Sequence, residues 1–456
     1  MFFHSVLCTC ILATPHITTN SFLTFTGTSC TADEPESILL YFIPGNPGLI
    51  AYYHTFLSLL SSTLISSTEY SDYDDGSAEN NSSTASSSRM GKVPQYIIHG
   101  KSMGGFEIVE NGKHVSCCSP PLTNIKANGG MEKQSQSQPQ AHHHPTTKTN
   151  KLYSLSKQIE HVERNLNNFV DAWHARKRAQ TRGKDLSDDR GRWRHFGGVK
   201  VILIGHSVGA YIAMEILRRH REGIKQKGAS ADTGGAGIGA SMDIVGGILL
   251  FPTVVDIAQS SSGRKLTKLL YVPYLAFLTS LLVKFLIFIL PGSWLRSIVG
   301  RVMGSPSETA IDTTVAFLKS ARGVEQAIHM SADEMRDITY DKWGDEIWGI
   351  ASSSSASSPM SAPSSEETPL NLVLYFAKQD HWVADRTRDE IIRVRGGVGS
   401  SSGSNGPRMQ VCEDGVVHGF CIQHSDIMAK KTAGWVRDII QRQQNLPNVH
   451  HRHVGR

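Results

Sequence analysis

The sequence predicts an α/β fold in which a mostly parallel sheet carries helices on both faces. Short apolar runs with the composition of buried strands alternate along the chain with segments of helical periodicity. One of these runs, VILI, passes directly into a GHSVG turn that opens a helix. Ligand sites in such sheets lie at the carboxyl ends of the strands, so the residues that follow each strand are the first candidates for chemistry.

The predicted strands are apolar runs bounded by turn residues, and the predicted helices show apolar residues three or four positions apart. Strands are expected at residues 37–43, 93–98, 198–204, 242–251, 371–377 and 409–412. Helices are expected at residues 51–60, 152–173, 210–219 and 420–443.

Five stretches rich in Ser, Gly, Asn, Gln and Pro are predicted to be disordered insertions in a single domain. They contain too few large apolar side chains to offset the entropy of ordering. They lie near residues 61–92, 119–150, 222–240, 351–368 and 396–407 of a domain that spans residues 31–445, before a C-terminal tail at 446–456.

Residues 1–30 are expected to form an uncertain N-terminal tail, and the apolar run at residues 1–15 is interpreted as a mobile tail or an edge strand. A secretory signal is disfavoured because no Lys or Arg precedes Arg89.

Composition excludes several function classes. The 46 Lys+Arg and 41 Asp+Glu of the 456 residues give a net charge of +5, which is too small and too mixed to indicate nucleic-acid binding. The seven cysteines are odd in number and form no CxxC array, so neither a disulfide framework nor a structural zinc site is expected. The run His142–His144 lies in a low-complexity stretch and indicates composition rather than a metal site. No metal or cofactor is predicted.

The GHSVG turn at residues 205–209 predicts a nucleophile. Ser207 would stand on a sharp turn with its hydroxyl above the sheet, and Gly205 and Gly209 would avoid clashes with the strand and the helix. The backbone N–H of Val208 would then point to the position of an oxyanion. Ser102 lies in a second GxSxG match, but the residues after it lack a helical pattern, which makes it the weaker alternative.

A second oxyanion donor is expected in the PGNPG loop at residues 44–48, after an early strand. Its two prolines have no N–H, which leaves Gly45, Asn46 and Gly48 as possible backbone donors. Asn46 is the first choice, through either its backbone or its side chain.

An acid and a base are expected after later strands. Asp380 ends the run LNLVLYFAKQD, with Asp385 as its competitor. His418 follows the last predicted strand, whereas His424 falls inside the closing helix and His381 lies too close to Asp380 in the chain. The order Ser207, Asp380, His418 is that of the α/β-hydrolase fold, in which the histidine takes the serine proton and the carboxylate orients the histidine.

Residues 269–290 form a long apolar run with Lys284 as its only charge. As a helix the run would be about as long as a bilayer's hydrocarbon core is thick. However, Lys284 near the centre and prolines at 273 and 291 disfavour a plain span. A segment that lies in the interface or dips into one leaflet is the preferred interpretation, and a buried lid helix is the alternative.

The motifs together resemble those of the lipid-droplet-associated hydrolases, a branch of the α/β-hydrolases. The resemblance is carried by IPGNPGLIAYYHTFL, SLSKQIEHVERNL, ILIGHSVGAYIAMEIL, ILLFPTVVDIAQSSSG, LYFAKQDHWVAD and HGFCIQHSDIMA. It implies a triad of Ser207, Asp380 and His418, and a hydrophobic segment that targets lipid droplets or the endoplasmic reticulum, in the place of residues 269–290. Sterol esters and other neutral lipid esters are the substrates that it implies.

The expected function is therefore a serine esterase that acts on a lipid ester at the cytoplasmic face of a droplet or of the endoplasmic reticulum, through an acyl-enzyme. One rival is a lipid-droplet structural or interaction protein with a weak or vestigial triad. Another is a soluble small-ester hydrolase whose apolar segment is a lid. A haloalkane dehalogenase is disfavoured because its nucleophile is a carboxylate, whereas residue 207 is serine.

Overall fold

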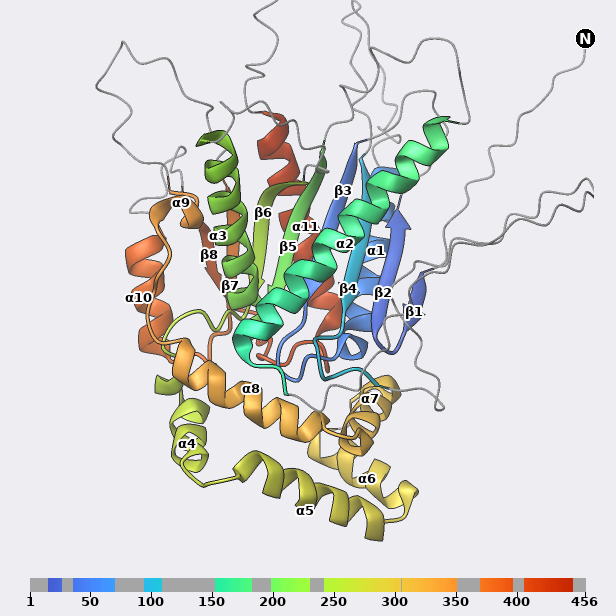
Figure 1. The fold of residues 1–456 in the computed structure, drawn as a ribbon, viewed down its shortest axis with the longest axis vertical. Coiled ribbons are helices and arrows are strands. Elements are labelled where there is room, and N and C mark those ends of the chain that lie inside the picture. Colours follow the sequence, from blue (N-terminus) through green and yellow to red (C-terminus); the bar gives the residue numbers. More distant parts are fainter. Residues whose placement is uncertain are drawn as a thin grey trace, which may run out of the picture.

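The computed structural model describes residues 15–26, 36–69, 94–108, 152–182, 198–229, 242–304, 306–350, 370–396 and 406–445. In this part of the chain, eight strands form one sheet in the order β1-β2-β4-β3-β5-β6-β7-β8. All pairings from β4 to β8 are parallel, and β2 pairs with β1 and β4 in antiparallel fashion. The predicted α/β class and mostly parallel sheet are confirmed (Figure 1).

Each predicted strand and helix has a counterpart. The strands are β1 (His16–Thr18), β2 (Ser21–Thr26), β3 (Ser37–Ile43), β4 (Gln95–Lys101), β5 (Val199–His206), β6 (Met242–Leu250), β7 (Asn371–Phe376) and β8 (Arg408–Val411). The helices outside the cap are α1 (His54–Glu69), α2 (Leu155–Arg182), α3 (Val208–Ala229), α10 (Asp385–Arg395) and α11 (Ser425–Gln444).

Two hydrophobic cores cover the two faces of the sheet because strand side chains alternate in direction. In β3, Leu39 and Tyr41 join the core shared with α2 and α3, whereas Leu40 and Phe42 join the core shared with α1 and α11. Figure 1 shows these two helical layers with the sheet between them.

The N-terminal segment is not only a tail. Residues Ser21–Thr26 form β2, which pairs with β4 along its length and with β1, the strand at the edge of the sheet. Phe22 is fully buried and Thr24 nearly so, which gives the strand a packed face. Residues 1–14 lie outside the described part of the chain.

Two predicted insertions begin later than expected. Helix α1 continues through Glu69, because Leu60 and Leu64, four positions apart, are buried in the core that α11 shares. Helix α3 continues through Ala229, and the pair Arg218–Glu222 stabilises its outer turns. The central parts of all five insertions lie outside the described residues.

A helical cap connects β6 to β7 and lies at the carboxyl end of the sheet (Figure 1). It comprises α4 (Ser261–Leu270), α5 (Leu275–Ile289), α6 (Gly292–Val302), α7 (Glu308–Lys319), α8 (Gly323–Asp337) and α9 (Asp345–Trp348). Helix α8 runs between the sheet and α5 and contacts both α5 and α7.

The apolar run at residues 269–290 is two helices rather than one. Helix α4 ends at Leu270 and α5 begins at Leu275, with Pro273 between them, and the two axes are bent by 97°. No single helix among the described residues is long and apolar enough to cross a membrane. Taken together, the bent pair α4 and α5 has the length and apolar composition of a span. The alternative of a buried helix is wrong, because Phe277, Phe285 and Phe288 are 54%, 61% and 85% exposed.

Candidate active site

The serine of the GHSVG turn occupies a strained position between β5 and α3. Ser207 has a φ of +55°, in the left-handed region that non-glycine residues rarely adopt. A Cβ added at Gly205 would overlap the carbonyl of Gly209, and one added at Gly209 would overlap the carbonyl of Ile43. Gly205 therefore lets the start of α3 lie close to the end of β5, and Gly209 lets it lie close to the end of β3.

The structure brings the three predicted triad residues into one hydrogen-bonded chain. The hydroxyl of Ser207 lies 2.9 Å from Nε2 of His418, and Nδ1 of His418 lies 2.8 Å from Oδ2 of Asp380. Asp380 follows β7 and His418 follows β8, so the carboxyl ends of three parallel strands supply the chain. With Nδ1 protonated toward Asp380, Nε2 is free to accept the serine proton.

The environment of Asp380 favours its ionised form. Burial alone raises the pKa of this carboxyl, but hydrogen bonding and charge interaction with His418 and the backbone N–H groups of Trp382 and Val383 outweigh it, so the pKa is lowered. The Trp382 N–H donates to Oδ1 at 2.7 Å, and Oδ2 is thereby left for His418.

The weaker alternatives stand outside this chain. Asp385 begins α10 and pairs with Arg388. His424 is the residue before α11, and His381 lies beside Ser261 on the rim of the pocket. Ser102 is buried, and its hydroxyl accepts a hydrogen bond from the backbone N–H of Ile50 at 3.2 Å.

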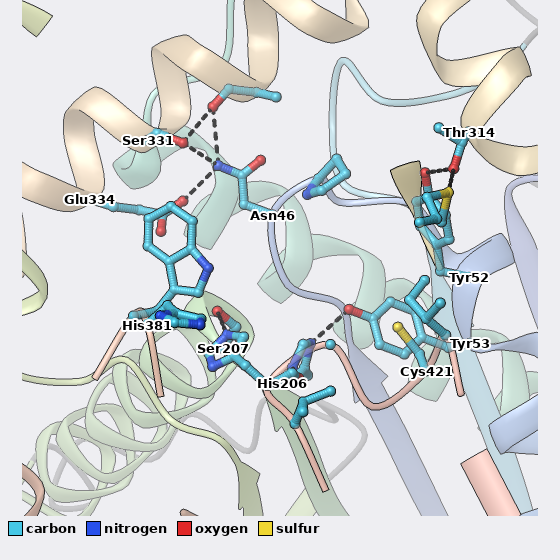
Figure 2. A pocket seen from close by; sticks show the side chains of 18 of the residues that line it. Asn46, Tyr52, Tyr53, His206, Ser207, Thr314, Ser331, Glu334, His381 and Cys421 are labelled. Atoms are coloured by element: carbon cyan, nitrogen blue, oxygen red, sulfur yellow. Dashed lines mark hydrogen bonds between the residues drawn. The ribbon is translucent and has the colours of Figure 1, made fainter. Parts of the chain in front are cut away.

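The PGNPG loop reaches the site, but the side chain of Asn46 is already engaged. Its Nδ2 donates to the carbonyl of Ala327 and to the side chains of Ser331 and Glu334, all on α8 (Figure 2). Asn46 was expected to donate to the oxyanion through its backbone or its side chain. Its backbone N–H is still available, since it makes no hydrogen bond within the described residues. Val208 begins α3, where the first N–H groups lack intrahelical acceptors.

Sequence reasoning missed His206, the residue before the serine. It is 5% exposed, its Nε2 donates to the backbone carbonyl of His418 at 2.9 Å, and its Nδ1 accepts from the hydroxyl of Tyr53 at 2.8 Å. Tyr53 in turn accepts from the N–H of Gly45 at 3.0 Å. Burial, aided by the nearby His418, lowers the pKa of His206 to about 3, so its ring is neutral and both bonds are satisfied by one tautomer.

A cavity of about 650 Å³ opens above Ser207 (Figure 2). Its lining includes apolar and aromatic side chains from the cap, from the segment before it and from the loops after β7 and β8, among them Ile257, Met303, Trp382, Val417 and Ile422. Among the described residues, no group of three or more His, Cys, Asp or Glu side chains could hold a metal ion. The site can therefore attack a carbonyl carbon with an activated serine beside a largely apolar pocket.

The family model and the curated relatives of this chain point to one family. The family model for lipid-droplet associated hydrolases matches residues 36–421. A lipid droplet-associated hydrolase of Gallus gallus is 23% identical over 410 residues, covering 89% of this chain and 87% of its own length. The relative from Mus musculus is 22% identical, with 88% and 85% covered.

Among solved structures, the peroxisomal alpha-beta-hydrolase Lpx1 of Saccharomyces cerevisiae is 7% identical, with 92% of this chain and 83% of that chain covered and a TM-score of 0.40. The family match spans strands β3 to β8, the cap and all three residues of the hydrogen-bonded chain. This protein therefore belongs to the lipid-droplet-associated hydrolase family.

Proposed function

We propose that this protein is a serine ester hydrolase that acts on neutral lipid esters, sterol or other, at the surface of a lipid droplet or of the endoplasmic reticulum. The observation that carries the proposal is the hydrogen-bonded chain from Ser207 through His418 to Asp380. Its serine end faces a largely apolar pocket. Membership of a hydrolase family supports the same class of reaction.

The reaction would proceed in two halves. Ser207 Oγ attacks the ester carbonyl carbon while His418 Nε2 takes its proton, and the backbone N–H groups of Val208 and Asn46 would stabilise the oxyanion. Collapse breaks the bond to the alcohol, which leaves with the proton from His418. Water, deprotonated by His418, then attacks the acyl-enzyme, and the fatty acid leaves as Ser207 recovers its proton.

The cap supports action at a lipid surface. Apolar side chains of α4–α6 are exposed over residues 269–302, among them Leu269, Phe277, Leu282, Phe288 and Trp294. An exposed apolar area of this extent is typical of a protein or membrane contact. Docking of residues 269–290 on the cytoplasmic face of a monolayer would hold the pocket, which lies between the cap and the sheet, close to the lipid phase.

Labelling with a fluorophosphonate probe tests the catalytic proposal. Purified protein should be labelled, Ser207→Ala should not, and Ser102→Ala should be labelled like the wild type. If folded wild type is not labelled even with lipid droplets present, the rival proposal of a lipid-droplet structural or interaction protein gains support.

A further inference from the structure

One part of the pocket wall, contributed by the PGNPG loop and α8, is polar. Asn46, Ser331 and Glu334 line the cavity together, and the two residues on α8 both accept hydrogen bonds from the amide of Asn46. The bond from Asn46 Nδ2 to Glu334 Oε1 is 2.9 Å long. A carboxyl group thus lies in the same cavity as the Ser207 hydroxyl (Figure 2).

The carboxyl of Glu334 is held uncharged. The residue is 4% exposed, and its pKa is raised to about 8. Burial is the main cause; the hydrogen bond from Asn46 lowers the pKa, and the nearby Asp333 raises it further. Near neutral pH most molecules therefore carry a proton on this group. Since Oε1 accepts from Asn46, the proton belongs on Oε2.

Oε2 has no partner in the protein. Among the described residues, the hydrogen bonds of Glu334 engage Oε1 and leave the other oxygen unbonded. Among the described residues, the fully buried side-chain atoms without a partner include Asn46 Oδ1 but not Glu334 Oε2, so Oε2 faces the open cavity. An O–H donor that faces a cavity needs an acceptor from whatever occupies it. A molecule in the pocket can supply that acceptor.

The acceptor must be an oxygen other than the scissile carbonyl. In the proposed reaction that carbonyl points to the N–H groups of Val208 and Asn46, so it is already engaged. An uncharged hydroxyl or a second ester group on the alcohol portion of the substrate meets the requirement. A steryl ester of an unsubstituted sterol has no oxygen outside its single ester group.

We propose that Glu334 is a specificity-determining residue that hydrogen-bonds a second oxygen of the substrate, which makes acylglycerols rather than steryl esters the substrate class of this site. The inference rests on the proposed hydrolase function, because it assigns the scissile ester to Ser207.

The test uses two octanoate esters that differ by one hydroxyl, 3-hydroxypropyl octanoate and butyl octanoate. Wild type should prefer the hydroxyl ester in kcat/KM by about fivefold or more, the effect of one hydrogen bond. Glu334→Leu should lose the preference, and Glu334→Gln should keep it because the amide is uncharged and retains a donor and an acceptor. Glu325→Leu is the matched control: it lies on the same helix, pairs with Arg322 and does not line the pocket.

Equal kcat/KM for the two esters in wild type would overturn the inference and leave the hydrolase proposal standing. So would a preference that survives in Glu334→Leu, or faster hydrolysis of steryl octanoate than of mono-octanoylglycerol. If Glu334→Leu does not fold, the wild-type ratio and the Glu334→Gln variant still decide.

Binding to Ser207→Ala separates the two proposals because it needs no turnover. Calorimetric titration with octyl 3-hydroxypropyl ether and octyl butyl ether should give tighter binding of the hydroxyl ether, and Glu334→Leu in the same background should abolish the difference. Suppose that the hydroxyl ether binds more tightly in a Glu334-dependent way, but fluorophosphonate does not label wild type. That result would support the recognition role of Glu334 and contradict the proposed hydrolase activity. Equal dissociation constants would overturn the recognition role.

Discussion

The ring of His206 holds the backbone of His418: its Nε2 donates to the carbonyl of the candidate general base at 2.9 Å. Through Nδ1 the same ring accepts from Tyr53, which accepts from the N–H of Gly45. The serine turn, the PGNPG loop and the histidine loop are therefore joined by three hydrogen bonds, two of them buried and one part-buried. The low pKa of His206 keeps its ring neutral, so the ring donates to the His418 carbonyl and accepts from Tyr53 at the same time.

Tyr53→Phe tests the junction between the serine turn and the PGNPG loop. The variant keeps the ring that packs on Phe42, with a centroid distance of 4.7 Å, but leaves the Gly45 N–H and Nδ1 of His206 without partners. We expect the free energy of unfolding to fall by about 1–3 kcal/mol. We also expect kcat to fall more than KM changes, because the loop that carries the Asn46 N–H is released. Urea denaturation and ester kinetics measure both, and an unchanged kcat would show that the loop is held by other contacts.

His206→Gln and His206→Ala test the hold on His418. A glutamine places an amide N–H close to the position of Nε2 and can still donate to the His418 carbonyl, whereas alanine cannot. We expect the glutamine variant to recover most of the kcat lost in the alanine variant, with thermal unfolding measured for both. Equal loss of kcat in two equally stable variants would contradict a role for this hydrogen bond.

The raised pKa of Glu334 predicts a pH dependence of stability. The ordinary pKa of a glutamate is 4.5, and the folded value is about 8, so between these values the folded state binds more protons than the unfolded state. The free energy of unfolding contributed by this group therefore falls as pH rises through that window, by at most about 1.4 kcal/mol per pH unit.

Glu334→Gln removes this titration. Compared with wild type, it should gain stability steadily from pH 5 to pH 8 in urea denaturation. Glu325→Gln, whose carboxylate has a lowered pKa beside Arg322, should show no such gain. A constant difference between Glu334→Gln and wild type across this range would mean that Glu334 titrates normally.

The sequence patterns predict the features that depend on residues close together in the chain, namely the strands and the residues that follow them. The strands β3, β5, β6 and β7 are apolar runs, and parallel pairing from β5 through β6 and β7 to β8 brings Ser207, Asp380 and His418 to one edge. Strand β2 was not predicted from the sequence, because the run SFLTFT is short and no helical pattern adjoins it. The bonds from Asn46 to α8 and from His206 to Tyr53 join residues 281 to 288 and 153 positions apart, and no spacing rule relates them.

Substitution of exposed phenylalanines on α5 tests docking at a lipid surface. Phe277, Phe285 and Phe288 are all more than half exposed, and transfer of each ring into lipid would contribute about 1.5–3 kcal/mol. The triple variant to serine should bind artificial lipid droplets at least about 100-fold more weakly in a flotation assay. Val394→Ser, a control on α10 with a 52% exposed side chain, should bind like wild type. Hydrolysis of a water-soluble ester should be retained by the triple variant, because none of the three rings lines the pocket. Undiminished flotation of the triple variant would mean that another surface of the protein contacts the lipid.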